Sequence, residues 1–237
     1  MKKYGLTAEF IEQWGKKLFR IKALISFGSV EAGELGGYVE KEDNLAQDGD
    51  AWVYGNARVY GDAEVYGNAM VYGNARVYGN AEVYGDAEVY GNARVYDDAR
   101  VCGDAEVYGN ARVCGNAEVC GDAEVCDDAR VCGNARVCGD ARVYGDARVY
   151  GNADYLLIGR IGSRFSFTTF FKNKDKGITV SCGCFLGTIA EFRAKVTDTH
   201  GNNKHAKIYN LAADMAELQI LGEEYFDKLN ANKSEPF

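Results

Sequence analysis

The chain has 237 residues, of which 47% are hydrophobic, and this is enough for one or two domains with a buried core. Its formal net charge of -8 disfavours a general nucleic-acid binder, because phosphate binding is driven by an excess of Lys and Arg. No apolar run approaches the length of a membrane span, so we expect no membrane contact.

Residues 1–46 are expected to form an N-terminal β cap. The segment "LFRIKAL" is a predicted strand, and "GGYVE" leads into the repeat that follows. The first residues, "MKKYGLTAEFIEQWGKKLFRIKALISFG", contain no uninterrupted apolar segment of the kind a signal peptide needs. The sequence therefore predicts a cytoplasmic protein, whose eight cysteines would meet a reducing environment.

Residues 47–154 consist of a six-residue repeat, in which a valine recurs at every sixth position from Val53 to Val149. The unit is V-[YC]-[GD]-[ND]-A-x. The stretch "A-x-V-Y" alternates as a short strand does, which predicts Ala and Val inside and the variable residue and Tyr or Cys outside. Gly followed by Asn or Asp predicts a turn, because these residues tolerate positive φ. One strand and one turn per six residues indicate a β-solenoid, which we call the prism.

The variable position of the repeat indicates how many sides the prism has. If three units make one coil, residues eighteen apart stack, and six arginines then share one column without exception. Spacings of twelve or twenty-four residues would scatter the arginines. We call this basic face the arginine column; it comprises Arg58, Arg76, Arg94, Arg112, Arg130 and Arg148. The sequence thus predicts a three-sided parallel prism of about six coils of 18 residues.

The repeat "V-Y-G-N-A-R" resembles that of left-handed parallel β-helices, the hexapeptide-repeat proteins. The left hand of the coil is implied by that resemblance alone. The flanking segments "LGGYVEKEDNLAQDGDAWVYG" and "YLLIGRIGSRFSFTTFF" are similar to a group of uncharacterised solenoid proteins from bacteria, phages and prophages. This likeness implies an architecture and a phage-like setting, and it implies no activity.

Residues 155–237 predict a small α+β domain, with a β-hairpin followed by two helices. The segments "RFSFTTFF" and "GITVSCGCF" alternate as strands and are joined by "KNKDKG". Thr188 and Glu191 have the spacing of a capping box, which predicts a helix that ends at Gly201. A second helix is expected to bury one apolar face, comprising Ile208, Leu211, Ala212, Met215 and Leu218.

We expect no catalytic residue, cofactor or metal in this protein, least of all in the prism. Acyltransferases with similar repeats use a histidine base, whereas residues 47–154 contain no His, Ser, Thr or Lys. Acyl transfer is therefore only a third hypothesis for the function. The six repeat cysteines are expected to be free thiols, because stacked strands lie about 4.7–4.9 Å apart and disulfide Cβ atoms prefer about 3.8 Å. Outside the prism, Cys182 and Cys184 with His200 and His205 leave a zinc site open as an alternative to apolar burial of the cysteines.

Two outer surfaces of the prism are candidates for binding a partner. The arginine column lies beside tyrosines, a combination common in binding hot spots. The alternative is that these arginines only cover tyrosine rings or bond the Asn and Asp corners. Around one corner we expect an acidic edge, which comprises Asp86, Glu88, Asp104, Glu106, Asp122 and Glu124.

The C-terminal domain offers a third candidate surface, in which hydroxyls, amides and cations gather near each other in the sequence. Such a set could bind phosphate or a carboxylate, or could simply be polar residues on the surface of a cap. Its members are Ser163, Arg164, Thr168, Thr169, His200, Lys204 and His205.

From these surfaces we expect a non-catalytic scaffold that binds a protein partner or a small anionic ligand. The alternative is an enzyme or small-ligand binder with its site in the C-terminal domain. Self-association is expected through that domain or through lateral faces of the prism.

Overall fold

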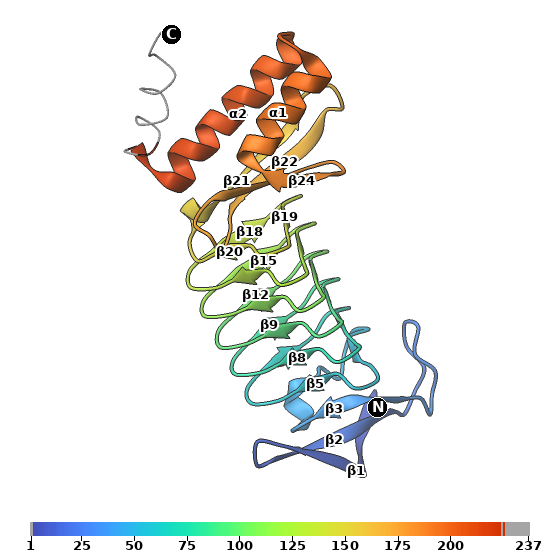
Figure 1. Cartoon of the computed structure of the whole chain (residues 1–237). Helices are drawn as coiled ribbons and strands as arrows, with labels where there is room; N and C mark the ends of the chain where they lie inside the picture. The colour runs from blue at the N-terminus through green and yellow to red at the C-terminus, as the bar shows by residue number, and fades with distance from the viewer. Residues whose placement is uncertain (1, 224, 226–237) are drawn as a thin grey trace.

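The computed structural model describes residues 2–223 and residue 225. It shows a straight prism with a small antiparallel hairpin at its N-terminal end and a mixed domain at its C-terminal end (Figure 1). The predicted class, a three-sided parallel β-solenoid with an N-terminal β region and a C-terminal α+β domain, is confirmed.

Three parallel sheets form the sides of the prism, and strands eighteen residues apart are neighbours in each sheet. Arg94, for example, pairs with Arg76 on one side and with Arg112 on the other. The first sheet contains β5 (Arg58–Val59), β8 (Arg76–Val77), β11 (Arg94–Val95), β14 (Arg112–Val113), β17 (Arg130–Val131) and β20 (Arg148–Val149). The second contains β4 (Trp52–Val53), β7 (Met70–Val71), β10 (Glu88–Val89), β13 (Glu106–Val107), β16 (Glu124–Val125) and β19 (Arg142–Val143). The third contains β6 (Glu64–Val65), β9 (Glu82–Val83), β12 (Arg100–Val101), β15 (Glu118–Cys120) and β18 (Arg136–Cys138).

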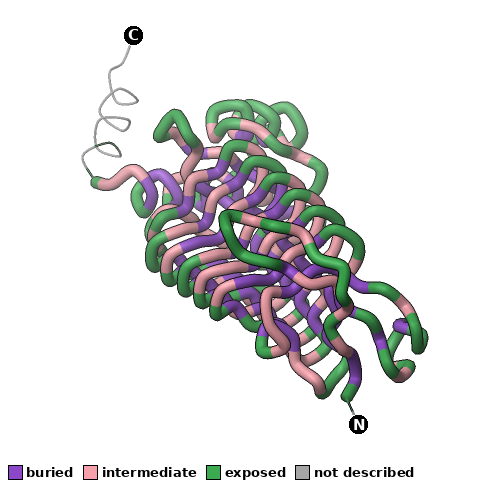
Figure 2. The backbone as a smooth tube through the Cα atoms, turned by 90° about the horizontal axis from the view of Figure 1, so that it is seen from below, coloured by how far each residue is buried: buried purple, intermediate pink, exposed green. Residues whose placement is uncertain are grey.

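The core of the prism is built from the alanine and valine of every repeat. From Ala51 to Val149 these side chains are fully buried, as the alternation within each short strand predicts. Figure 2 shows the buried positions recurring coil after coil, with exposed corners between them. The small alanine allows the three walls to approach each other closely, and the branched valine fills the remaining space.

The corners of the coils require positive φ, which glycine adopts without strain. Gly103, with φ +72°, also lies so close to the next coil that a Cβ there would be 2.9 Å from the Gly121 nitrogen. Asp97 and Asp127 occupy two of these corners with positive φ and are the exceptions to glycine in the repeat. The following Asn or Asp side chains bond from coil to coil, as Asn80 Nδ2 does to Asp98 Oδ1 at 2.9 Å.

The N-terminal cap extends the first sheet and closes one end of the prism. Strands β1 (Tyr4–Gln13) and β2 (Lys16–Ala23) form an antiparallel hairpin, and β3 (Leu35–Val39) joins β2 to β5. A 3-10 turn, η1 (Glu42–Asn44), follows. Unpaired strand edges promote association between chains, so this cover keeps the end of the solenoid from stacking.

The C-terminal domain covers the last coil with a four-stranded antiparallel sheet. After η2 (Asn152–Asp154) come β21 (Tyr155–Ile161), β22 (Ser166–Lys172), β23 (Ile178–Cys182) and β24 (Phe185–Thr188). Phe171 belongs to the core of the prism, and Tyr144 Oη lies 2.9 Å from Ser181 Oγ. The predicted hairpin corresponds to β22 and β23, and its neighbours on both sides were not predicted.

Two helices, α1 (Ile189–His200) and α2 (Lys204–Leu221), pack on this sheet. The predicted capping box is present, with Glu191 N donating to Thr188 Oγ1 at 3.3 Å and Thr188 N donating to Glu191 Oε2 at 2.7 Å.

The predicted buried face of α2 was wrong. Of its five residues only Ala212 is buried, whereas Leu211 and Met215 are well exposed. The buried face instead contains Ala206, Tyr209, Ala212, Ala213, Ala216, Glu217 and Ile220. Four alanines and a glutamate are weak hydrophobic signals, yet the small side chains are what let α2 lie close to α1 and the sheet.

The prediction of six free thiols in the prism was also wrong. The structure contains the disulfides Cys114–Cys132 and Cys120–Cys138, each joining neighbouring coils. The comparison of strand spacing with an ideal Cβ separation was misleading, because the Cα–Cα distances of 4.5 and 4.6 Å lie within the range that disulfides accept. Cys102 and Cys126 are free.

Candidate functional site

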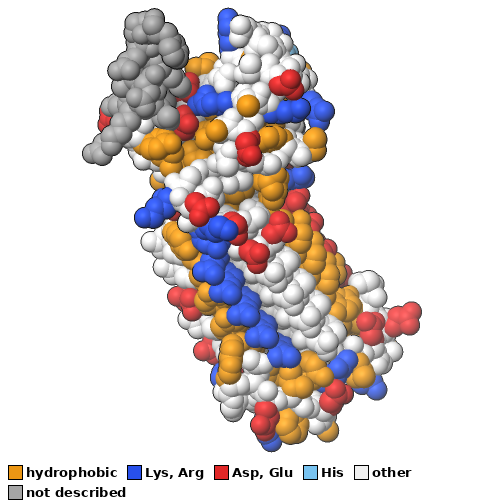
Figure 3. Space-filling model, in the orientation of Figure 1, with side chains coloured by type: hydrophobic (Ala, Val, Ile, Leu, Met, Phe, Trp, Pro, Cys, Tyr) orange, Lys and Arg blue, Asp and Glu red, His pale blue; other side chains and the backbone are white. Residues whose placement is uncertain are grey.

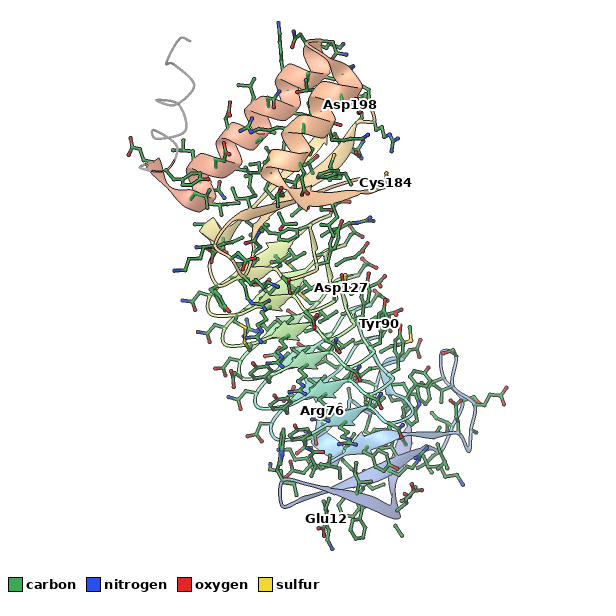
Figure 4. All side chains as sticks on the ribbon, viewed as in Figure 1. Glu12, Arg76, Tyr90, Asp127, Cys184 and Asp198 are labelled. Atoms are coloured by element: carbon green, nitrogen blue, oxygen red, sulfur yellow. A yellow bond between two sulfur atoms is a disulfide. The ribbon has the colours of Figure 1, made fainter. Side chains whose placement is uncertain are left out.

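The arginine column forms a continuous basic stripe along the first sheet (Figure 3), and Arg76 marks its position on β8 (Figure 4). Neighbouring arginines are related by one coil, so about 4.7–4.9 Å separates their backbones. A groove of about 330 Å³ runs beside them. Its lining alternates Asn or Asp with Arg, in the order Asn92, Arg94, Asn110, Arg112, Asp128, Arg130, Asp146 and Arg148.

The four middle arginines of this column have no charge partner. Among the described residues, no ion pair and no hydrogen bond involves the guanidinium groups of Arg76, Arg94, Arg112 and Arg130. The two terminal members differ, because Arg58 donates to Gln13 Oε1 and Arg148 donates to Ala147 O at 2.8 Å. The alternative in which the arginines bond to the corners therefore holds only at the end of the column.

A ladder of tyrosines lies beside the arginine column. The rings of Tyr60 and Tyr78 stack at 5.0 Å and those of Tyr78 and Tyr96 at 5.1 Å. The disulfide Cys114–Cys132 continues the line. Trp14 of the N-terminal hairpin packs edgewise on Tyr60, which is buried by the cap although it points out of the prism. Burial raises the pKa of Tyr60 to about 12, because the cap keeps water away from its hydroxyl.

The third sheet, unlike the arginine column, contains ion pairs between neighbouring coils. There Arg136 lies 3.0 Å from Glu118, and Arg100 lies 3.6 Å from Glu82. This fold can therefore stack opposite charges one coil apart. In the arginine column, by contrast, each arginine is stacked on other arginines. Like charges at this spacing repel each other, which is tolerable when solvent or a partner screens them.

The acidic edge lies on the second sheet and is compensated in part. Asp86, Glu88, Asp104 and Glu106 line a groove of about 500 Å³ together with Asp50. Glu88 accepts a hydrogen bond from Tyr72 at 2.6 Å, and burial together with this bond raises the pKa of Tyr72. Farther along, Glu124 pairs with Arg142 at 3.0 Å, and Asp122 is exposed outside the groove.

The C-terminal domain contains a pocket of about 220 Å³ between β23, β24 and α1. Ser163, Arg164 and His200 line it, as the sequence suggested, and they are joined by Lys195 and Thr199. No carboxylate is among its lining residues, although Lys195 Nζ lies 3.4 Å from Asp198 Oδ2 outside it. The lining also includes Cys182, Cys184, Phe185, Phe192, Val196 and Tyr209. Cys184 lies at the turn from β23 to β24 (Figure 4).

The other predicted members of that set lie elsewhere. Thr168 and Thr169 are buried in the sheet, where Thr169 Oγ1 accepts from Arg142 N at 3.2 Å. Lys204 and His205 begin α2 outside the pocket. Lys195 was missed, although its place one turn before Thr199 on the same helix face was a usable signal.

Of the possible zinc ligands, Cys182, Cys184 and His200 line the C-terminal pocket, and the ring of His205 lies 5.9 Å from that of His200. Among the described residues, the one group of three potential ligand atoms within 4.8 Å of one another is Glu118, Cys120 and Cys138. Two of these three are joined by a disulfide, so that group is not available to a metal while the bond exists.

Comparison with known families supports the fold. Four segments of the prism match the YdcK beta solenoid repeat, over residues 51–64, 63–79, 87–103 and 141–153. The matches lie within the repeat and cover less than half of the chain, so the likeness concerns the solenoid. No curated protein matches the chain. Within the described part of the chain, no helix has the length and apolarity needed to cross a membrane.

Proposed function

We propose that this protein is a non-catalytic scaffold whose prism binds an acidic segment of a partner protein along the arginine column. The observation that carries the proposal is the row of four arginines without charge partners, beside the ladder of stacked tyrosines. Burying such a row against carboxylates relieves the repulsion within it. The phage or prophage setting that the resemblance implies makes a host protein the proposed partner.

The spacing of the column favours an acidic helix over an extended acidic strand. Carboxylates on one face of a helix recur at about 5.4 Å per turn, whereas those on one face of a strand recur at about 6.8 Å. The former is closer to the coil spacing of about 4.8 Å, and flexible guanidinium groups can absorb the difference. A long polyanion such as DNA fits less well, because the whole chain carries a net charge of -8.

The first prediction concerns the arginine column. A variant with Arg94→Ser and Arg112→Ser is expected to bind fluorescent poly-L-glutamate about 10-fold more weakly, a loss of about 1.4 kcal/mol. Binding by the wild type should weaken as salt rises, because exposed ion pairs are screened. Fluorescence anisotropy at several salt concentrations measures both effects.

The third sheet supplies a matched control. Arg100→Ser with Arg136→Ser removes the same formal charge from arginines that are paired with glutamates. This variant should bind poly-L-glutamate nearly as well as the wild type. Equal weakening of both variants would show that only overall charge matters, and the proposed surface would then be wrong.

A second candidate function is favoured by the C-terminal pocket, where Arg164, Lys195 and His200 lie beside aromatic side chains. Of these three, Lys195 has an exposed ion pair with Asp198, which a bound anion can replace. Cations beside aromatic side chains suit a small ligand with a ring and an anionic group. This second function corresponds to the alternative named in the sequence analysis, an enzyme or small-ligand binder with its site in the C-terminal domain.

The second prediction tests this pocket with phenyl phosphate as the probe. Saturation-transfer NMR should detect phenyl phosphate, and Arg164→Gln with Lys195→Gln should abolish the signal. Arg160→Gln with Lys176→Gln is the control, because both residues are exposed in the same domain and neither lines the pocket. Retention of the signal in the pocket variant would exclude this site.

A further inference from the structure

The helix α2 has a second apolar face that the described chain leaves uncovered. Ile208, Leu211, Met215 and Leu218 are 39%, 63%, 57% and 45% exposed. The opposite side of α2, with Tyr209, packs against α1 and the sheet, so the helix is already anchored without these four residues. We call these four residues the α2 seam. A contiguous exposed apolar stripe of this kind marks an interaction surface.

The spacing of the α2 seam matches that of one helix packing along another. Its members follow each other by three, four and three residues, the alternation that places side chains at the contact line of a two-helix coiled coil. Tyr225 is also exposed, but it follows Gly222, where α2 ends, and so it is not part of this face. The helix exposes this line for most of its length, from Ile208 to Leu218 within Lys204–Leu221.

The charges at the two ends of α2 identify the partner and its direction. Lys204 and Lys207 are exposed at its start, and Glu223 is exposed just after its end. An antiparallel second copy of the same helix would bring each basic end beside an acidic end, and it would also oppose the helix dipoles favourably. A parallel copy would place lysine beside lysine.

We propose that the protein forms a two-fold symmetric dimer by antiparallel packing of the α2 seam against the same seam of a second copy. If the two-fold axis crosses α2 at the level of Ala213, Leu211 lies against Met215 of the second copy and Ile208 lies against its Leu218. Such an isologous contact is closed and stops at two chains. The dimer displays two arginine columns, which would strengthen binding to a partner with several acidic segments.

The chain's own last residues are the competing occupant of the α2 seam. Residues 226–237, "FDKLNANKSEPF", lie outside the described part of the structure. Their large apolar residues are Phe226, Leu229 and Phe237, and these do not repeat the spacing of the α2 seam. A second copy supplies that spacing in full.

Sedimentation velocity of the full chain, with reductant present to prevent disulfides between molecules, tests the proposal. We expect the mass to rise from 25.9 kDa toward twice that value as concentration increases. Leu211→Glu with Met215→Glu should weaken the dimer by more than about 100-fold without changing the circular dichroism spectrum. Leu186→Glu is the matched control, because Leu186 is 47% exposed on β24, and it should dimerise normally.

Charge exchange tests the direction of packing. Lys204→Glu and Glu223→Lys should each weaken the dimer by about 3-fold, and the two together should restore it. Restoration is not expected for a parallel pair. A monomeric wild type at all concentrations overturns the proposal, as does a dimer that survives Leu211→Glu with Met215→Glu. A chain ending at Tyr225 that dimerises when the full chain does not would assign the α2 seam to residues 226–237 and also overturn it.

Discussion

A Val95→Asp variant is expected to lose at least about 4 kcal/mol of unfolding free energy, a large part of the roughly 5–15 kcal/mol that stabilises a folded domain. Val95 is fully buried in the middle of the prism, between Val77 and Val113 of the adjacent coils. A carboxylate at this depth has no hydrogen-bond partner, because the surrounding side chains are Ala and Val. Urea titration followed by circular dichroism measures the loss.

The neighbouring residue provides the control for that variant. Arg94→Asp introduces the same side chain one position earlier in β11, where it points outward between Arg76 and Arg112. Because two unpaired cations flank it, we expect unfolding free energy to stay within about 0.5 kcal/mol of the wild type or to rise. Similar destabilisation by both substitutions would contradict the inward and outward assignment of the strand.

Removing the disulfide Cys114–Cys132 by double substitution with serine is expected to cost about 3 kcal/mol in the chain-entropy description, because the bond closes a loop of 18 residues. The oxidised protein should show four reactive thiols when unfolded without reductant, from Cys102, Cys126, Cys182 and Cys184. All eight should react after reduction.

Thiol counting in denaturant, before and after reduction, checks the bond directly. The substitution Cys102→Ser is a suitable control, because Cys102 occupies the same kind of position and is free. It should leave the unfolding free energy almost unchanged. Eight reactive thiols in protein isolated from a reducing cytoplasm would show that the disulfides form only after exposure to an oxidising environment.

The prism could be predicted in detail because its periodicity is unbroken. At every repeat the valine favours a strand and the glycine favours a turn with positive φ. The local preferences therefore agree with the overall fold in every coil. The column formed by Arg58 and its five successors then selected the eighteen-residue coil, which the pairing of Arg94 with Arg76 and Arg112 confirms.

The ends of the chain were harder to predict, since nothing repeats there. The buried face of α2 was misassigned because Leu211 and Met215 look like core residues, whereas the actual core relies on Ala213 and Ala216. The hydrophobicity of a side chain indicates that it favours burial, but it does not indicate which part of the protein, or which other molecule, buries it. The sequence also could not predict that Arg112 lacks a charge partner, because the distance between two charged groups depends on the conformation of each side chain.

The Gly103 corner and its equivalents make every coil nearly interchangeable with the next. A gene that gains or loses eighteen codons within the repeat would therefore encode a longer or shorter rod with the same cross-section. Each such step moves the two ends apart or together by about 4.8 Å, one strand spacing. The number of repeats therefore sets the distance between the N-terminal hairpin and the C-terminal pocket.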